Sequence, residues 1–185
     1  MFLTRLANLF TLKAFIKDRR GVSALEFALC APLLIMAYLG LAELTLGMMA
    51  SRRASHLAAT VGDLAAQSST LTNANVTDLF AIGSSILQPF TTGTSLKIRL
   101  TCVTMNNSNQ AIVNWSDGQN MVPYATNAII PAITTAQISP GESLIMTETE
   151  YDYTSPIGNF LPGTSAFKDT FYHHPRNGTA VVRTP

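Results

Sequence analysis

The sequence predicts an α+β protein in which a long N-terminal membrane-spanning helix continues as an amphipathic stem and packs on a small antiparallel sheet. Residues 27–42 carry no charge, and the apolar run resumes after Glu43 as far as Ala50. Residues 51–67 place apolar side chains at helical spacing, whereas several later segments alternate apolar and polar residues. At 185 residues, the chain has room for one anchor and one modest domain.

Charge is distributed unevenly along the chain. Charged residues make up 12% of the sequence and hydrophobic residues 47%, which argues against disorder and against a nucleic-acid binder with a broad basic surface. Residues 1–21 carry five Lys or Arg and one Asp, a net charge of +4, whereas residues 54–185 carry five basic and eight acidic residues. This asymmetry predicts a cytoplasmic N-terminus and an exported C-terminal domain, because basic residues favour the cytoplasmic side of a span. Arg52 and Arg53, which follow the span, oppose this orientation under the same rule.

The apolar segment is long enough to cross a bilayer. As a helix, residues 22–50 would extend roughly 43 Å, against about 30 Å of hydrocarbon core, and Glu26 and Glu43 would lie near its edges. A cleaved secretory signal peptide fits less well, because the apolar region of such peptides is shorter than the apolar run of this chain. An unprocessed signal anchor explains the span but gives Glu26 no role, and an ionisable residue in a membrane helix favours a functional explanation.

The residues around Glu26 carry a resemblance to a known family. The segment RRGVSALEF (residues 19–27) resembles the processing site of type IV pilins and pseudopilins, in which a prepilin peptidase cuts after a glycine and the mature chain has glutamate as its fifth residue. The longer segment 17–47 is similar to the TadE-like pseudopilins of the tight-adherence (Tad/Flp) pilus system. Pro32, Gly40 and Glu43 are among its matching features.

The resemblance implies assembly rather than catalysis, and no cofactor. It implies cleavage between Gly21 and Val22, removal of residues 1–21 as a leader, and assembly roles for Glu26 and Glu43. Cleavage would leave an ammonium group on Val22 one helical turn from Glu26. Pairing of these charges would define axial register, because a misplaced subunit leaves both unpaired. Gly21 also fits a flexible hinge before the helix.

The span contains residues suited to packing against other helices. Pro32 removes one backbone hydrogen bond and is expected to kink the helix. Gly40 and Gly47 belong to a stripe of small residues at three- and four-residue steps, which lets another helix approach closely. Ordinary membrane-helix composition, which is rich in Gly and Ala, accounts for the stripe equally well.

The resemblance also implies partners and a location. The expected partners are a prepilin peptidase, the major pilin, other minor pilins and the inner-membrane pilus assembly platform; no nucleic acid is expected. Residues 22–50 would cross the bacterial inner membrane once and residues 51–185 would be periplasmic, from where the subunit could enter the extracellular pilus. Two alternatives remain: a signal-anchored protein with an exported binding or enzymatic domain, and a pseudopilin of a secretion system.

The exported part is expected to contain a stem, a second helix and about four strands. Residues 51–67 form the stem, and the second helix is expected to be capped by Asn75 and ended by Pro89. Strands are expected at residues 95–103, 111–115, 143–155 and about 170–174, with turns at 106–110 and 116–120 and a long connection at 123–142.

The strand at 143–155 is expected to be the longest and to place its acidic residues on one face. In an antiparallel pairing with residues 96–103, that acidic face would meet Lys97 and Arg99. The acidic residues Glu148, Glu150 and Asp152 are spaced about 7 Å apart along the strand, which favours a solvated sheet face over a metal site.

Two adjacent histidines, His173 and His174, are also candidates for chemistry. On a strand they point to opposite sides, so they are not expected to hold a metal together. A surface or partner contact is the expected role for this pair. No phosphate-binding loop, zinc-protease or serine-hydrolase motif is present in the sequence.

Overall fold

A computed structural model describes residues 21–157 and 165–185 of the chain. The chain divides into two compact units, residues 1–43 and residues 44–185. Helix α2 (Val22–Gln67) contributes to both units, and every other described helix and strand belongs to the second. The expected α+β class, with one long N-terminal helix and a small antiparallel sheet, is confirmed.

In the first unit, the described residues 21–43 expose most of their large apolar side chains. Phe27 is 72% exposed, Leu29 71% and Tyr38 72%. Pro32 lies inside α2, and the helix continues through it. Apolar exposure of this extent is typical of a segment in contact with lipid, and α2 is long and apolar enough to cross a membrane.

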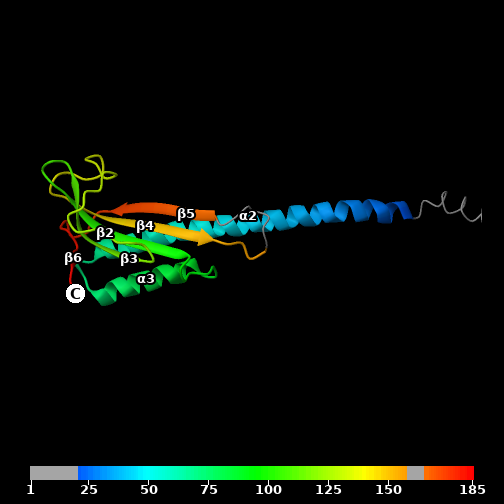
Figure 1. The fold of residues 1–185 in the computed structure, drawn as a ribbon, viewed down its shortest axis with the longest axis horizontal. Coiled ribbons are helices and arrows are strands. Elements are labelled where there is room, and N and C mark those ends of the chain that lie inside the picture. Colours follow the sequence, from blue (N-terminus) through cyan, green and yellow to red (C-terminus); the bar gives the residue numbers. More distant parts are fainter. Residues whose placement is uncertain (1–20, 158–164) are drawn as a thin grey trace, which may run out of the picture. The chain divides into compact units, whose positions relative to one another are not determined.

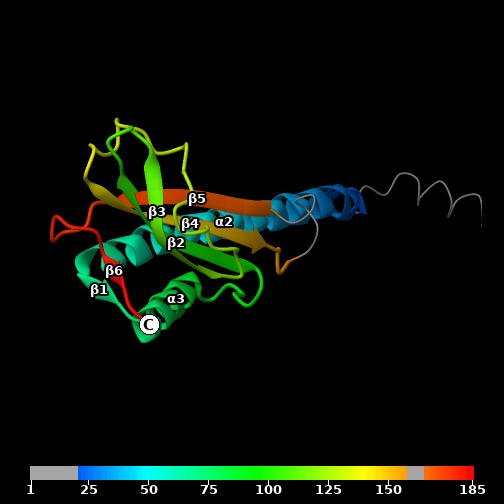
Figure 2. The same cartoon turned by 60° about the vertical axis from the view of Figure 1, so that its left-hand side comes forward.

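The second unit is built on a four-stranded antiparallel sheet in the order β3-β2-β4-β5 (Figure 1). The strands are β2 (Leu96–Met105), β3 (Ala111–Gln119), β4 (Ser143–Tyr153) and β5 (Ser165–His173). Helix α3 (Asn73–Leu87) and the part of α2 in this unit share one hydrophobic core with the sheet (Figure 2). The expected helix-on-sheet packing is therefore present.

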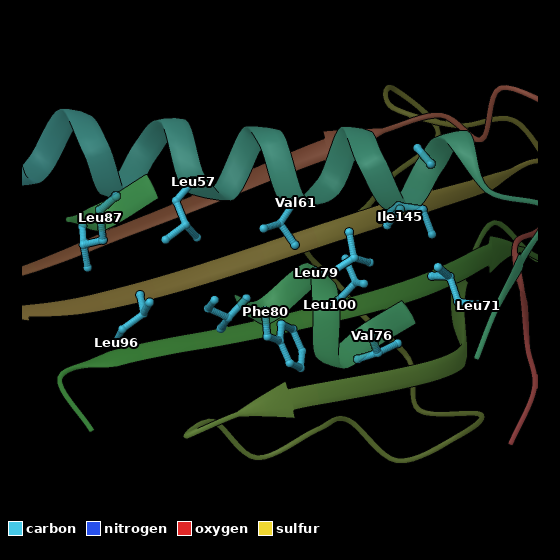
Figure 3. Close-up of a cluster of buried hydrophobic side chains, with 14 of the residues drawn as sticks. Leu57, Val61, Leu71, Val76, Leu79, Phe80, Leu87, Leu96, Leu100 and Ile145 are labelled. Carbon is cyan, nitrogen blue, oxygen red and sulfur yellow. The ribbon is translucent and has the colours of Figure 1, made fainter. Parts of the chain in front are cut away.

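The main core lies between the two helices and the sheet. Figure 3 shows Leu57 and Val61 of α2 pointing toward β2 and β4. A Cβ atom at Gly83 of α3 would lie 3.1 Å from Ile98 Cδ1 and 3.3 Å from Val61 Cγ2, so glycine lets α3 approach both neighbours closely. Cys102 is buried in this core, and burial raises the pKa of its thiol to about 11.

The opposite face of the sheet is partly covered by the long connection between β3 and β4, residues 120–142. Ile130, Ile133 and Ile138 of this connection are buried and form a second hydrophobic cluster with strand residues such as Val103. Antiparallel sheets often leave one face to solvent. Here the connection covers part of that second face, which explains why both faces of β2 carry buried apolar residues.

The pairing of the longest strand is as expected from the sequence. β4 has 11 residues, and it pairs with β2 so that Lys97 lies opposite Glu150 and Arg99 opposite Glu148. Several boundaries differ from expectation, however: β2 continues two residues further, to Met105, and β4 ends two residues earlier, at Tyr153. Three larger differences each have a physical cause.

The N-cap of α3 is Thr72, not Asn75. The Thr72 hydroxyl accepts a hydrogen bond from the Asn75 backbone N–H at 3.2 Å, and the Asn75 side-chain oxygen accepts one from the Thr72 N–H at 3.0 Å. Both residue types are good caps. The reciprocal hydrogen bonds satisfy two backbone N–H donors that would otherwise lack partners. The helix therefore begins after Thr72, three residues before the expected cap.

The turn expected at residues 116–120 is instead mostly strand, and the strand expected at 170–174 is longer. β3 continues to Gln119 because Ser116 to Gln119 pair with β2. β5 begins at Ser165 because it pairs with β4 over nine residues. Pairing partners thus extended two strands beyond what their own residues indicate.

Two short strands, β1 (Thr70–Leu71) and β6 (Val182–Arg183), pair in parallel and were not anticipated. They attach the C-terminal segment to the turn between α2 and α3. Next to them, the Trp115 indole donates a hydrogen bond to the Val181 carbonyl at 2.7 Å. Strands of two residues carry no detectable periodicity, so no sequence pattern indicates them.

Arg183 fixes this C-terminal segment by several contacts at once. Its guanidinium lies 2.7 Å from Asp117 Oδ2 of β3, and it also donates hydrogen bonds to Asn73 Oδ1 and the Leu71 carbonyl. A single side chain thereby links β3, the start of α3 and β1.

Candidate functional site

The first candidate residues lie at the start of α2. Gly21 is the first described residue, and a Cβ added to it would meet no heavy atom within 4 Å. Val22 begins the helix, and Glu26 follows one turn later with its side chain exposed. Four helical residues advance about 6 Å along the axis, which places Glu26 on the same side as Val22. The rest of the expected leader, residues 1–20, lies outside the described residues.

Glu43 has very different surroundings. Its side chain is 0% exposed, and neither carboxylate oxygen has a hydrogen-bond partner among the described residues. Burying a carboxyl group without such a partner costs free energy. Of these two glutamates, Glu26 is therefore the accessible one, whereas a neighbouring chain could reach Glu43 only if the residues covering it moved.

One part of the small-residue stripe is open to a neighbouring helix, and the other part packs against the sheet domain. A Cβ at Gly40 would meet nothing within 4 Å, whereas one at Gly47 would lie 3.7 Å from Tyr153 Cε1 of β4. Ala50 and Ala54 are 0% exposed and belong to the main core. The stripe from Gly47 onward thus packs on the chain's own sheet domain, and Gly40 is the glycine left open for another helix.

Sequence reasoning missed a further glycine of α2. A Cβ at Gly62 would lie 2.6 Å from both His173 Nδ1 and Thr147 Oγ1, so only glycine allows α2 to lie this close to β4 and β5. Both polar atoms are buried and have no hydrogen-bond partner among the described residues. His173 therefore faces the helix, whereas His174 is exposed beyond the strand end, as expected for alternating side chains.

The electrostatics around His173 follow from this packing. Burial lowers the pKa of His173, and Arg176 lowers it further, while Asp63 opposes both effects. Arg176 Nη2 lies 2.7 Å from Asp63 Oδ1, and this hydrogen-bonded pair lowers the pKa of Asp63. The pair connects the last turns of α2 to the segment after β5.

The acidic residues of β4 are ion-paired across the sheet. Lys97 Nζ lies 2.8 Å from Glu150 Oε1 and 3.1 Å from Asp152 Oδ2, and Lys168 Nζ lies 2.9 Å from Glu150 Oε2. Hydrogen bonds from Lys97 and then Lys168 lower the pKa of Glu150. Three adjacent strands are thus linked by complementary charge, which gives the acidic face a structural explanation.

The Arg99–Glu148 pair is the least exposed of these ion pairs. Arg99 Nε lies 2.7 Å from Glu148 Oε2, and the two side chains are 15% and 20% exposed. Tyr124, from the long connection, stacks its ring 3.7 Å from the guanidinium carbon. Sequence alternation indicated the ion pair, but nothing near Tyr124 indicated this contact. Within residues 21–157 and 165–185, no three His, Cys, Asp or Glu side chains gather as a metal site would require.

The comparisons with known proteins concern the helix. Residues 21–63 match the model of a family described as TadE-like protein. The match begins at Gly21 and includes all of α2 except its last four residues, and it confirms the sequence resemblance over residues 21–47. No curated protein and no solved structure matches the chain.

Proposed function

We propose, from the premise that residues 21–63 match the TadE-like family, that this chain is a minor pilin or pseudopilin that takes part in assembling a Tad-type adhesive pilus. The observation that carries the proposal is the arrangement at the start of the match: an open Gly21–Val22 bond followed one turn later by an exposed carboxylate, Glu26, on an apolar helix. The function is structural, without catalysis.

In this proposal the chain is made as a precursor. A prepilin peptidase cuts after Gly21, residues 1–21 are removed, and α2 anchors the mature subunit in the inner membrane with residues 51–185 in the periplasm. The subunit then contacts the assembly platform, the major pilin and other minor pilins.

Glu26 supplies the register of assembly. The new ammonium group on Val22 and the Glu26 carboxylate lie at the membrane edge, where water no longer screens them fully. A subunit entering at the wrong depth leaves both charges unpaired in a low-dielectric environment, which costs several kcal/mol by order of magnitude, about the penalty of breaking a buried pair. Glu26 can meet this ammonium group on its own chain or on a neighbour.

The remaining helix residues support packing in this proposal. Gly40 is open on α2 and allows a neighbouring helix to approach. Pro32 lies inside the continuous helix, where it leaves one backbone carbonyl without its usual helical partner. An assembly role for Glu43 remains a prediction, which requires movement of the residues that cover it.

The decisive experiment is N-terminal sequencing and intact mass measurement of the protein from membranes of strains with and without the prepilin peptidase. We expect a chain that begins at Val22 only when the peptidase is present. Retention of residues 1–21 in both strains would contradict the proposal and leave a signal-anchored protein. A start near residues 52–60 would indicate an ordinary secreted protein.

The role of Glu26 is tested separately. Glu26→Ala and Glu26→Gln should insert and be cleaved, yet reduce the number of pili. Asp78→Ala is the matched control, because it removes an exposed carboxylate from α3, away from the membrane segment. Normal piliation with both Glu26 variants would remove the assembly role from this residue.

A further inference from the structure

An open groove lies in the second unit, where α2 passes the end of α3. Its volume is about 980 Å³. Met48 and Met49 of α2 and Ile86 of α3 give it apolar walls, and Arg52 and His56 supply polar atoms. Met48 is 51% exposed and Met49 37%, although both belong to the domain and not to the first unit. An exposed apolar surface of this kind needs an occupant.

The charge in the groove favours an anionic occupant. Arg52 and Arg53 both line it, and no Asp or Glu among the described residues does. Arg53 is already engaged, because its guanidinium donates hydrogen bonds to the Ile86 and Gln88 carbonyls. Arg52 is exposed, and within the described part of the chain its guanidinium forms no ion pair.

The position of the groove along α2 fits the membrane boundary. A hydrocarbon core takes about 20 helical residues, so a span that starts at Glu26 ends near residue 46. Met48 and Met49 follow directly, and Arg52 lies about 9 Å beyond that boundary. Side chains on a helix lean toward its N-terminus, which here is toward the membrane, and a long arginine side chain can reach back to the headgroup level.

We propose that this groove binds an anionic phospholipid from the exported leaflet. The phosphate pairs with Arg52, and an acyl chain lies against Met48, Met49 and Ile86. The inference rests on the membrane anchoring in the proposed function, but not on cleavage after Gly21 or on pilus assembly. It gives the outer end of the anchor a lipid preference that depends on the sheet domain.

The test uses the full-length precursor, purified from a strain without the peptidase so that cleavage plays no part. The protein is reconstituted with equal amounts of phosphatidylglycerol and phosphatidylcholine of the same acyl chains, and retained lipid is counted by native mass spectrometry. We expect phosphatidylglycerol to be retained preferentially. One arginine near a membrane surface contributes about 1 kcal/mol, so Arg52→Gln should reduce that preference about fivefold.

Two further variants separate the site from general effects. Arg176→Gln removes the same charge from an exposed residue outside the groove and should leave the preference unchanged. Ser85→Trp places a large side chain in the groove and should reduce retention of phosphatidylglycerol. Thermal unfolding followed by circular dichroism, which a second tryptophan does not confuse, shows whether each variant remains folded.

Equal retention of the two lipids by the wild-type protein, or an unchanged preference in folded Arg52→Gln, would overturn the proposal. Efficient cross-linking of Ser85→Cys between two copies, without retained lipid, would instead assign the groove to an interface between subunits. Failure of Gly21 cleavage would count against the proposed function and leave this lipid result unaffected.

Discussion

The close approach of α2 to the sheet at Gly62 can be tested by comparing two glycine-to-alanine substitutions in the same helix. In Gly62→Ala, the new Cβ would lie 2.6 Å from His173 Nδ1 and Thr147 Oγ1. In Gly47→Ala, it would lie 3.7 Å from the Tyr153 ring, which is ordinary van der Waals contact. Both substitutions give the helix the same gain in propensity, so their difference isolates the effect of packing.

The magnitude follows from these distances. Replacing Gly by Ala inside a helix stabilises it by up to about 1 kcal/mol, and Gly47→Ala should show that gain. Overpacking in a well-packed core costs about 1–3 kcal/mol. Thr147 cannot easily move, because it is 0% exposed and β-branched on a central strand. Gly62→Ala should therefore be about 1–3 kcal/mol less stable than Gly47→Ala.

The assay is thermal unfolding of the full-length chain in detergent. Trp115 is the only tryptophan and lies in the sheet domain, so its fluorescence reports unfolding of that domain. At about 2–4 °C per kcal/mol for a chain of this size, the two variants should differ by at least about 2 °C in Tm. Equal Tm values, or a more stable Gly62→Ala, would show that α2 does not lie this close to β4 and β5.

Three other predictions concern the sheet domain. In a double-mutant cycle, Arg99→Met and Glu148→Met should show a coupling free energy of about 1–2 kcal/mol in denaturant unfolding, because the pair is largely shielded from water; additive effects would contradict this. Burial holds the pKa of His173 below its usual 6.5, so the unfolded chain binds more protons and stability is lost as pH falls below that value. His173→Gln should therefore flatten the dependence of unfolding free energy on pH between about pH 7 and pH 5, whereas an unchanged slope would assign the effect to another group. In a Cys30→Ser background, Cys102 should react with a maleimide at neutral pH only after unfolding, since its pKa is raised to about 11; rapid labelling of the folded protein would show that the core opens.

The long elements could be predicted because each carries a repeated pattern. The alternation in β2 and β4 fixed which side chains face each other, and thus the ion pairs of Lys97 and Arg99. The apolar run and helical spacing together indicated the full length of α2. Such patterns are local, and local periodicity is the strongest signal of secondary structure in a single sequence.

What the sequence did not reveal depends on contacts between distant residues. β3 was expected to stop before Ser116, but pairing with β2 extends it. The role of Gly62 depends on side chains more than 80 positions away, and no residue near it signals that contact. Among the candidate residues, the start of α2 could be identified from sequence, whereas the burial of Glu43 could not.

The anchoring of β6 has a consequence for how the protein is produced. The Val181 carbonyl accepts a hydrogen bond from the Trp115 indole N–H, and Arg183 contacts both Asp117 of β3 and Asn73 at the start of α3. These contacts cannot form until residues 181–183 are in place, and these residues follow every strand of the four-stranded sheet in the chain. The sheet domain is therefore completed last at this point, and a chain cut short before Val181 would leave Trp115 and Asp117 without these partners and expose part of the core to proteases.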